Sequence, residues 1–338
     1  MQTLQIRLTK ELIKKAQKLV DRGLYSNKSE VIRDSLRRLV LKDQLITKNK
    51  KKYSIIYSSD MHGNTLQFKK LFNRAYKTKA DAIIIGGDIA PKDKKHRTIK
   101  DQKYFLEKKF VPLIKEFNKK NKSINHNTSI FIIMGNDDFK SNYLTLKKYE
   151  KIGFKLIHKN ITKLHEDFKI IGYSYVPLTP FINKDWEKLD LIKERERKWR
   201  KDYVLEGRKS KGSKFYKFKF DLEKRKDTIE KDLKNIFKKN NTKKTILVSH
   251  APPHNTNLDL LYNNEHTGSL AIRKIIEKEE IYLSLHGHIH ETVDKSGEFS
   301  DKIKKTICMT SGNDHTTKTI SIIEFNLYEP KKALRVII

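Results

Sequence analysis

The pattern of apolar and polar residues divides the chain into a short N-terminal part and a longer, more regular part. From residue 53 onward, apolar runs alternate with segments in which apolar residues recur every three or four positions, which predicts strands alternating with helices. Buried strands are predicted at residues 53–58, 82–85, 129–134, 245–249 and 281–285, and further strands near 154–158, 169–173, 306–310, 319–325 and 333–337. Helices are predicted at residues 64–77, 101–119, 142–151 and 269–277. This succession predicts an α/β fold of two packed sheets with helices outside.

The first 46 residues show a different pattern. Apolar residues alternate with polar ones over residues 3–8, which predicts a short half-buried strand, and two amphipathic helices are predicted after it. The first of these helices is predicted to end at Gly23, and residues 47–52 are expected to form a basic linker. One strand and two helices have too small a core to be stable alone, and the edge of the strand is unpaired. Because pairing the strands of two copies removes both problems, residues 1–46 predict a homodimer.

Residues 185–244 interrupt the regular succession with a highly charged segment, which we expect to be a mostly helical insertion bordering the functional site. Its centre lacks acidic residues and interleaves basic with aromatic side chains: Arg208, Lys209, Lys211, Lys214, Phe215, Tyr216, Lys217, Phe218, Lys219 and Phe220. Such a stretch can stack on bases and neutralise phosphates, or it can be a solvated edge whose aromatic residues pack inward. The sequence leaves both interpretations open.

Charge and composition narrow the choice of partners. The formal net charge of +33 and the pI of about 9.9 favour nucleic acid or another polyanion, although a generally lysine-rich composition would give the same numbers. Cys308 is the lone cysteine, which excludes a disulfide framework and a cysteine-based zinc finger. No apolar run approaches the ~18–20 residues of a membrane span, and the N-terminal alternation is not that of a signal peptide. We therefore expect a cytoplasmic protein with no membrane partner.

Seven residues that can ligate metal ions lie directly after predicted strands. They are Asp60, His62, Asp88, Asn136, His250, His288 and His290. Because an α/β fold exposes the ends of its strands together, we expect these side chains to converge. Their mixture of carboxylate, amide and imidazole groups suits Mn²⁺, Fe, Ni or Zn²⁺ better than Ca²⁺. Neighbouring glycines such as Gly87 and Gly135 would let the backbone turn sharply and a substrate approach closely.

The order of these residues and glycines resembles the calcineurin-like metallophosphoesterases from about residue 53 to the C-terminus. Residues 250–253, 257–259, 268–269 and 286–291 look like the Icc-related branch. The resemblance implies a two-sheet metallophosphoesterase sandwich over residues 53–338 and two divalent ions, with Mn²⁺ the first expectation. It implies one ion held by Asp60, His62, Asp88 and His290, and a second held by Asp88, Asn136, His250 and His288. With Asp88 bridging, a hydroxide shared by the ions would attack a phosphate ester, which makes Asp88 and Asn136 the catalytic candidates.

One position departs from the family pattern. The residue after the motif asparagine is usually a histidine that assists the leaving group, and here it is Asp137. An ionised carboxylate cannot donate a proton and repels a phosphate unless its pKa is raised or a cation pairs with it. His254, His266 and His286 are therefore candidate proton donors, although His286 could equally hold a metal ligand in place. Asp138 is expected to support or cap the loop, and the remaining histidines are expected to be structural: His96, His126, His158, His165 and His315.

The N-terminal pattern resembles the ribbon-helix-helix DNA-binding family over residues 2–46, chiefly in the segments 4–8 and 23–33. This implies a small β-α-α domain whose paired strands enter the major groove of double-stranded DNA. The outward side chains would read base edges, and they are those of Thr3, Gln5 and Arg7. Free backbone amides at the start of the second helix would grip a phosphate, at Asn27, Lys28 and Ser29. The alternative is a module that only dimerises the protein.

Three functions follow from these features. The first is a two-metal phosphoesterase, expected to act on a phosphodiester in a nucleotide or nucleic acid, dimerised and brought to DNA by its N-terminal domain. The second is a DNA-binding transcriptional regulator whose phosphoesterase domain senses a phosphorylated ligand, which Asp137 favours. The third is a metabolic enzyme that residues 1–46 only dimerise. The complete ligand set favours an enzyme.

Overall fold

The computed structural model describes residues 8, 10–36, 51–92, 98–193, 203–224, 226–238 and 242–338. The chain forms two compact units, Met1–Lys52 and Tyr53–Ile338. Among the described residues, no helix is both long and apolar enough to cross a membrane.

The N-terminal unit contains two helices in its described part. Helix α1 spans Lys10–Asp21, Gly23 follows it with a φ of +69°, and residues 28–36 form the second helix. Ala16 and Val31 are buried in this unit. The predicted strand at residues 3–8, with Thr3, Gln5 and Arg7, lies outside the described residues apart from Leu8. The linker predicted at residues 47–52 also lies mostly outside them.

The second helix of this unit begins with a hydrogen-bonded cap. The Asn27 side chain accepts a hydrogen bond from the Glu30 amide at 3.0 Å, and the Glu30 carboxylate accepts one from the Ser26 amide at 2.8 Å. This reciprocal pair satisfies backbone groups at the helix start. Asn27, Lys28 and Ser29 therefore lie on its first turn, with Lys28 and Ser29 helical and exposed.

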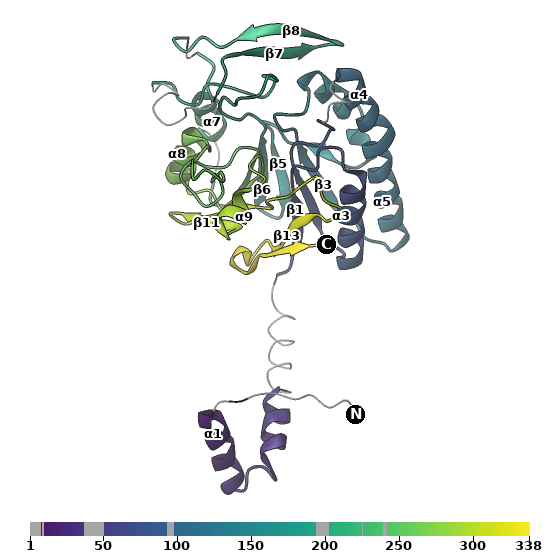
Figure 1. Cartoon of the computed structure of the whole chain (residues 1–338). Coiled ribbons are helices and arrows are strands. Elements are labelled where there is room, and N and C mark those ends of the chain that lie inside the picture. The colour runs from purple at the N-terminus through teal and green to yellow at the C-terminus, as the bar shows by residue number, and fades with distance from the viewer. Residues whose placement is uncertain are drawn as a thin grey trace. The chain divides into compact units, whose positions relative to one another are not determined.

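The larger unit is built on two six-stranded sheets (Figure 1). In spatial order, the first sheet contains β14 (Leu334–Ile337), β13 (Ser321–Asn326), β1 (Ser54–Ser58), β2 (Ala82–Gly86), β3 (Ser129–Ile133) and β4 (Lys155–Leu156). The second contains β11 (Ser300–Ile303), β12 (Thr306–Thr310), β10 (Leu283–His286), β9 (Thr245–Ser249), β6 (Phe168–Tyr173) and β5 (Ile161–His165). Strands β1 to β4 run parallel, as do β6, β9, β10 and β12. Both sheets therefore end their parallel strands in loops where ligands can converge.

Helices cover the outer faces of the sheets (Figure 1). On one side lie α3 (Thr65–Thr78), α4 (Ile99–Phe105), a π-helical turn (Leu106–Phe110) and α5 (Val111–Ser123). On the other lie α7 (Ile229–Phe237) and α8 (Leu270–Glu279). Short elements complete the fold: α6 (Tyr143–Lys147), α9 (Thr292–Ser296) and the 3₁₀ turns Lys140–Asn142, Glu150–Ile152 and Pro330–Lys332.

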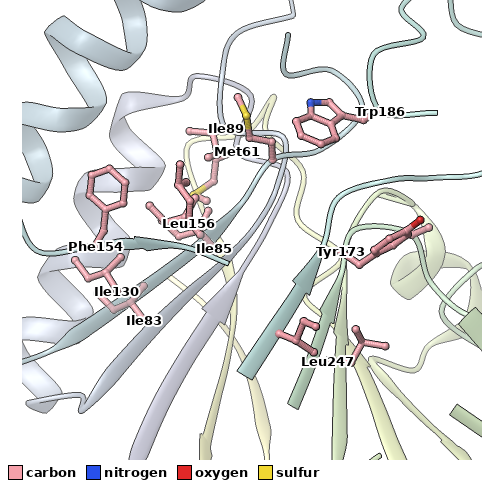
Figure 2. Packing of buried hydrophobic residues seen from close by; sticks show 14 of the residues in the cluster. Met61, Ile83, Ile85, Ile89, Ile130, Phe154, Leu156, Tyr173, Trp186 and Leu247 are labelled. Carbon is pink, nitrogen blue, oxygen red and sulfur yellow. The ribbon is translucent and has the colours of Figure 1, made fainter. Parts of the chain in front are cut away.

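The central strands are apolar on both faces because both faces are covered. On β2, Ile83 and Ile85 pack toward the helices, whereas Ala82 and Ile84 pack between the two sheets. Figure 2 shows part of the helix-side cluster, in which Ile83, Ile85 and Ile130 lie near Phe154 and Leu156. Such continuous burial explains why these strands read as unbroken apolar runs.

Most predicted elements are found, and several boundaries differ. The helix predicted at 101–119 starts earlier and contains the π-helical turn, and the helix predicted at 142–151 is a single short α-helix between two 3₁₀ turns. The strand predicted at 154–158 shrinks to Lys155–Leu156 at the edge of its sheet.

The prediction of a mostly helical insertion at residues 185–244 is wrong for its described part. Its basic and aromatic centre is a β-hairpin of β7 (Glu206–Lys211) and β8 (Lys214–Lys219), and α7 is its helix. The residues alternate with the two-residue period of a strand, and Gly212, with a φ of +60°, provides the left-handed conformation that a two-residue turn needs. Because many of these residues are charged, the sequence shows no clear alternation of apolar and polar positions here.

Candidate metal centre

The predicted ligands follow the strands in tight, strained loops. Four of them adopt a positive φ that side chains other than glycine rarely take: Asp60 at 60°, His62 at 40°, Asp88 at 50° and His288 at 73°. Backbone hydrogen bonds tie the loops after β1 and β2 together, since the amides of Asp60 and His62 donate to the carbonyls of Gly87 and Asp88 at 3.0 and 2.8 Å. Non-glycine residues in this region mark sites where the surrounding structure imposes the conformation.

One group of ligands joins the two sheets. The ligating atoms of Asp60, Asp88 and His250 lie within 4.8 Å of one another, and all three residues are buried. The His250 Nε2 atom lies 3.4 Å from Asp88 Oδ2, 3.9 Å from Asp60 Oδ1 and 3.0 Å from Asn136 Oδ1. The other ring nitrogen, Nδ1, lies 2.8 Å from the Gly86 carbonyl. When Nδ1 donates to that carbonyl, Nε2 is left with a lone pair facing the carboxylates, as a metal ligand requires.

The electrostatics of this group favour cations. Burial alone would raise the pKa of Asp88, but His250 and His62 hold it well below its usual value. Burial alone would lower the pKa of His250, but Asp88 and Asp60 raise it to about 9. Among the described residues, neither carboxylate has a lysine or arginine nitrogen within 4.0 Å. Buried carboxylates without such partners are characteristic of metal sites.

A second group consists of three histidines: His62, His290 and His315. The Nε2 atoms of His62 and His290 lie 3.2 Å apart, and the ring of His315 lies 4.4 Å from that of His62. The Nδ1 atoms of His62 and His315 are buried and have no hydrogen-bond partner in the described structure. Burial lowers the pKa of His62 well below its usual value, so this imidazole is neutral and available as a ligand.

His315 was expected to be structural, and its position in this group could not be read from its neighbours in sequence. It follows β12, which pairs in parallel with β10, the strand that precedes His288 and His290. A histidine soon after a strand adjacent to a ligand-bearing strand is a usable signal. His315 lies five residues beyond the end of β12, which is too far for the strand pattern to mark it as a ligand.

His288 is held close to the first group through its backbone. Its amide donates to both carboxylate oxygens of Asp60, at 3.0 and 3.2 Å, and its ring lies 5.3 Å from that of His250. The preceding Gly287 permits this approach, because a Cβ atom there would lie 2.5 Å from Asp60 Oδ2. All seven predicted ligands thus lie in one connected cluster.

Asp137 and Asp138 have different surroundings. The Asp137 carboxylate lies 3.7 Å from His62 Nδ1 and 3.4 Å from Lys92 Nζ, and burial together with Asp88 raises its pKa to about 6. Asp138 is fully buried and accepts hydrogen bonds from the amides of Ile89, Ala90 and Gly135 at 2.8–3.1 Å. Asp138 therefore ties the loop after β3 to the loop after β2, as expected of a supporting residue.

The three histidines proposed as proton donors are placed differently from one another. His286 is fully buried, with Nδ1 3.0 Å from the Ala251 carbonyl and Nε2 2.8 Å from Ser284 Oγ. The Nδ1 contact links the end of β10 to the residue after β9, and the Nε2 contact stays within β10. Both ring nitrogens are therefore engaged, which suits the alternative role of a positioning residue. His254 and His266 share the buried carboxylate of Asp259, with Nδ1 atoms 3.5 and 2.8 Å from its oxygens. Proton donation by either of these two histidines stays a prediction.

A large cavity of about 1140 Å³ opens beside the histidine group. Its lining includes His62, Asp137 and His315 from the metal side, and Phe139 and Lys92 from the adjoining loops. The opposite wall comes from outside the predicted motifs: Tyr104, Phe105 and Lys109 from the helical side, Phe181, Ile182 and Asn183 from the segment after β6, and Arg208 from the hairpin. The volume exceeds what an inorganic phosphate needs, so a phosphate ester with a sizeable organic group fits.

The residues present fit divalent cations. Carboxylates, imidazoles and an amide oxygen converge in one buried cluster, and unpartnered imidazole nitrogens face it. Nitrogen and oxygen donors of this kind suit Mn²⁺, Fe, Ni or Zn²⁺. The two-sheet α/β sandwich with these ligands in the loops after its parallel strands is the architecture of a metal-dependent hydrolase.

Comparison with known proteins agrees with this class. Residues 53–292 match the family model of the calcineurin-like phosphoesterases, so the chain belongs to that family and is a metal-dependent phosphoric ester hydrolase. A curated relative, the uncharacterized protein MJ1162 of Methanocaldococcus jannaschii, is 48% identical over 75 residues. The matched part is 20% of this chain and spans 30% of the length of that relative.

Solved structures are similar to the chain at low sequence identity, and one of them has a TM-score above 0.5. One crystal structure is similar with a TM-score of 0.53 and 13% identity, over 85% of this chain and 99% of the other. TT1561 of Thermus thermophilus has a TM-score of 0.47 and 14% identity over 85% and 99% of the two chains. A dimetal phosphatase from Danio rerio has a TM-score of 0.45 and 9% identity over 81% and 93%.

Proposed function

We propose that this protein hydrolyses phosphodiesters of nucleotides or nucleic acid with two divalent ions, Mn²⁺ first among the candidates. The observation that carries the proposal is the buried convergence of Asp60, Asp88 and His250 beside the group of His62, His290 and His315. The cavity next to these groups supports an ester with a large organic part, because its volume is about 1140 Å³. Membership of the Icc-related branch stays a prediction.

The proposed ligands divide into two sets that share Asp88. Asp60, His62, Asp88 and His290 would hold one ion, and Asp88, Asn136, His250 and His288 would hold the other. The Asp88 carboxylate supports this division, since its Oδ2 atom lies 3.5 Å from His62 Nε2 on one side and 3.4 Å from His250 Nε2 on the other. His315 lies with His62 and His290 and is an additional candidate ligand. When bound, two such ions neutralise the oxygens of a phosphate ester and activate water at neutral pH.

The protein's own groups would orient the substrate and the ligands. The Asp137 amide donates to Asp88 Oδ1 at 2.8 Å and holds the shared carboxylate in place. The Asn183 Nδ2 atom donates to the Asn136 carbonyl at 2.7 Å and positions the loop of that ligand. Lys92 lies beside Asp137 at the cavity wall and offsets its negative charge where a phosphate would enter. Asp137 thus replaces the usual histidine without leaving an uncompensated anion.

The test is hydrolysis of bis(p-nitrophenyl) phosphate, p-nitrophenyl phosphate and a DNA oligonucleotide with Mn²⁺ by the wild type and by Asp88→Asn. The variant should lose about 10³-fold or more in kcat/KM, because a single stabilising group of a transition state is often worth about 10²–10³ and Asp88 would act on both ions. Metal content by mass spectrometry should fall in parallel. Asp167→Asn, a change at an exposed aspartate paired with Lys244, is the matched control and should keep both. Full activity in Asp88→Asn would overturn the proposed mechanism.

We also propose that the N-terminal unit forms a homodimer that binds double-stranded DNA. Several of its apolar side chains are exposed in the single chain, including Leu12 at 53% and Leu24 at 63%. Such exposure on a two-helix unit supports a partner that covers it. Thr3, Gln5 and Arg7 would read bases, and the first turn at Asn27, Lys28 and Ser29 would meet a phosphate. A cytoplasmic location stays a prediction from the sequence.

Gel shifts with the full-length chain test the DNA contacts once a preferred duplex has been selected. Arg7→Ala should cost about 1–3 kcal/mol and relax sequence preference, whereas Lys28→Ala should weaken all duplexes similarly. Leu12→Glu should yield a monomer in sedimentation if the exposed apolar side chains form the dimer contact. A wild-type chain that sediments as a monomer, or that binds no duplex at low salt, contradicts this part of the proposal.

A further inference from the structure

Strand β7 forms part of the wall of two different hollows. Arg208 lines the large cavity beside the metal ligands, whereas its neighbour Lys209 lines a separate pocket of about 620 Å³. Consecutive residues of a strand point to opposite faces, so Arg208 and Lys209 reach different hollows. The face of the hairpin that carries Arg208 also carries Phe215.

The backbone of Arg208 is tied to the loop of a proposed metal ligand. Its amide donates to the Ile182 carbonyl, and its carbonyl accepts from the Lys184 amide, both at 2.8 Å. Between these residues lies Asn183, whose side chain donates to the Asn136 carbonyl. The close approach needs Gly207, because a Cβ atom there would lie 2.2 Å from the Ile182 carbonyl oxygen. Arg208 is therefore held at a set position relative to Asn136.

The Arg208 guanidinium packs against aromatic rings but forms no ion pair with a described residue. Its Cζ atom lies 3.9 Å from the centre of the Phe215 ring and 5.9 Å from that of Phe139, and the two rings contact each other edge to face. The Nε atom is buried and has no hydrogen-bond partner in the described part of the chain. No carboxylate of a described residue lies within 4.0 Å of the guanidinium. Of the two that line the same cavity, Asp137 pairs with Lys92, and Asp101 bonds Thr98 at the start of its own helix.

Arg208 lines the cavity with no ion pair to a described carboxylate, so an anion in the cavity would supply the missing partner for its charge. A guanidinium offers a planar fork that matches a phosphate in two parallel hydrogen bonds. The cavity thus has a second place for an anion, separate from the one beside the metal ligands.

The outer part of the cavity suits the organic portion of such a substrate. Tyr104, Phe181 and Ile182 line it and are exposed by 59%, 49% and 66%. Exposed aromatic rings beside a cationic group are the elements on which nucleobases stack. Lys109 contributes a further positive charge to the same lining.

We propose that Arg208 binds a second, non-reacting phosphate of the substrate, so that the substrate class is an oligonucleotide or dinucleotide with a phosphate next to the scissile one. This inference rests on the proposed function, which places the scissile phosphate at the metal ligands. The hairpin then selects the substrate, and a simple diester lacks the group that Arg208 binds.

The test compares the thymidine dinucleotide TpT with the same dinucleotide phosphorylated at its 5′ or its 3′ end, alongside bis(p-nitrophenyl) phosphate. With Mn²⁺ bound, the wild type should prefer one phosphorylated dinucleotide over TpT by about tenfold or more in kcat/KM, since hydrogen bonds to charged groups contribute about 1.5–3 kcal/mol. Arg208→Met should remove this preference mainly through KM, and its loss on the phosphorylated dinucleotide should exceed its loss on bis(p-nitrophenyl) phosphate by about tenfold. Arg208→Lys should restore part of it.

Lys217→Met is the matched control. Lys217 pairs with Arg208 across the hairpin, is exposed and does not line the cavity, so its loss removes the same charge from the same hairpin. This variant should keep the wild-type preference. Equal loss of preference in both variants would indicate a general charge effect and overturn the assignment to Arg208.

Other outcomes separate this inference from the proposed function. A wild type that cleaves diesters without preferring a phosphorylated dinucleotide, or an Arg208→Met variant that keeps the preference or loses all substrates equally, overturns the role of Arg208 and leaves the phosphodiesterase in place. A wild type that cleaves no diester overturns the proposed function. In that case calorimetric binding of the same dinucleotides to wild type and Arg208→Met with the metal chelated still decides whether Arg208 binds the second phosphate.

Discussion

The loops after β1, β2 and β3 and the hairpin β7–β8 line the same cavity, yet they are built from opposite kinds of backbone. In the loops, Asp60, His62 and Asp88 have positive φ angles and are buried among hydrogen-bonded neighbours. In the hairpin, the residues follow a regular antiparallel register, and most side chains are at least partly exposed. Arg208 lines the cavity because side chains alternate between the two faces of a regular strand.

This difference separates two tasks. Ligand geometry depends on strained conformations that the surrounding structure must enforce, so a small change there is transmitted to several ligands at once. Substrate selection by the hairpin depends on which side chain occupies an alternate position and on how the hairpin is seated. We therefore expect changes in the loops to abolish chemistry and changes in the hairpin to alter preference.

The largest effect is expected for Gly135→Ala. A Cβ atom at this position would lie 2.2 Å from Asp88 Oδ1 and 2.5 Å from His250 Nε2, so it must displace two proposed ligands. We expect metal content to fall and kcat/KM on bis(p-nitrophenyl) phosphate to drop by about 10²-fold or more, since misplacing reacting groups by about 1 Å can cost that much.

Gly297→Ala is the control for the glycine itself. Gly297 has a φ of +75° with no atom within 4 Å of the added Cβ, so the variant carries only backbone strain, about 1 kcal/mol. It should lose some stability and keep its metal. Normal metal content and activity in Gly135→Ala would show that the loops tolerate displacement and would remove the contrast with the hairpin.

An intermediate effect is expected for Gly207→Ala. The added Cβ would lie 2.2 Å from the Ile182 carbonyl oxygen and should push β7 away from residue 182. Metal content should be unchanged, while the preference for a phosphorylated dinucleotide should fall by about tenfold with Arg208 displaced. Gly212→Ala at the hairpin turn, where nothing lies within 4 Å, should keep the preference. A loss of metal in Gly207→Ala would mean that the two regions are not separable.

The smallest effect is expected for His158→Asn, at a residue that does not line the large cavity. The His158 ring lies among Tyr173, Tyr175 and Trp186, and burial, with Lys159 and Lys140 nearby, lowers its pKa from 6.5 to about 3. Between those two pH values the unfolded chain binds more protons than the folded one. The contribution of His158 to stability is therefore complete above pH 6.5 and is lost as the pH falls toward 3.

Denaturant unfolding at pH 4.5, 5.5 and 7.5 measures this contribution. The wild type should lose up to about 1.36 kcal/mol per pH unit more than His158→Asn below pH 6.5. The asparagine oxygen can still accept the hydrogen bond that the Ser174 amide donates to His158 Nδ1 at 3.0 Å. Parallel pH profiles in the two proteins would mean that His158 titrates equally in the folded and unfolded states.

Much of the metal site could be predicted because its signals are local. Each ligand follows a short apolar run, and the parallel strands bring those run ends together in the loops around Asp60, Asp88 and His250. The strands themselves were predicted well because both of their faces are buried, which leaves an unbroken apolar signature. Gly87 and Gly135 were likewise predicted from the need for close backbone approach, and an added Cβ at either would clash.

The insertion and His315 could not be predicted in the same way. The hairpin is stabilised by contacts such as Phe215 on Phe139 and the bonds of Arg208 to residues 182 and 184, which join positions far apart in sequence. His315 reaches His62 and His290 because β12 lies beside β10, and strand order is decided by packing between sheets. No local pattern encodes either neighbour.

The sequence by itself determined most elements outside residues 185–244, the ligand types and the class of chemistry, because strand periodicity and residue chemistry are properties of short segments. Only the tertiary structure decided which groups meet: that Asp138 ties two loops together, that His286 contacts the end of β9 and that Arg208 lines the large cavity while Lys209 lines another pocket. The physical reason is that burial and distance between remote segments depend on how whole sheets and the hairpin pack, and one residue of shift in β7 would exchange the faces of Arg208 and Lys209.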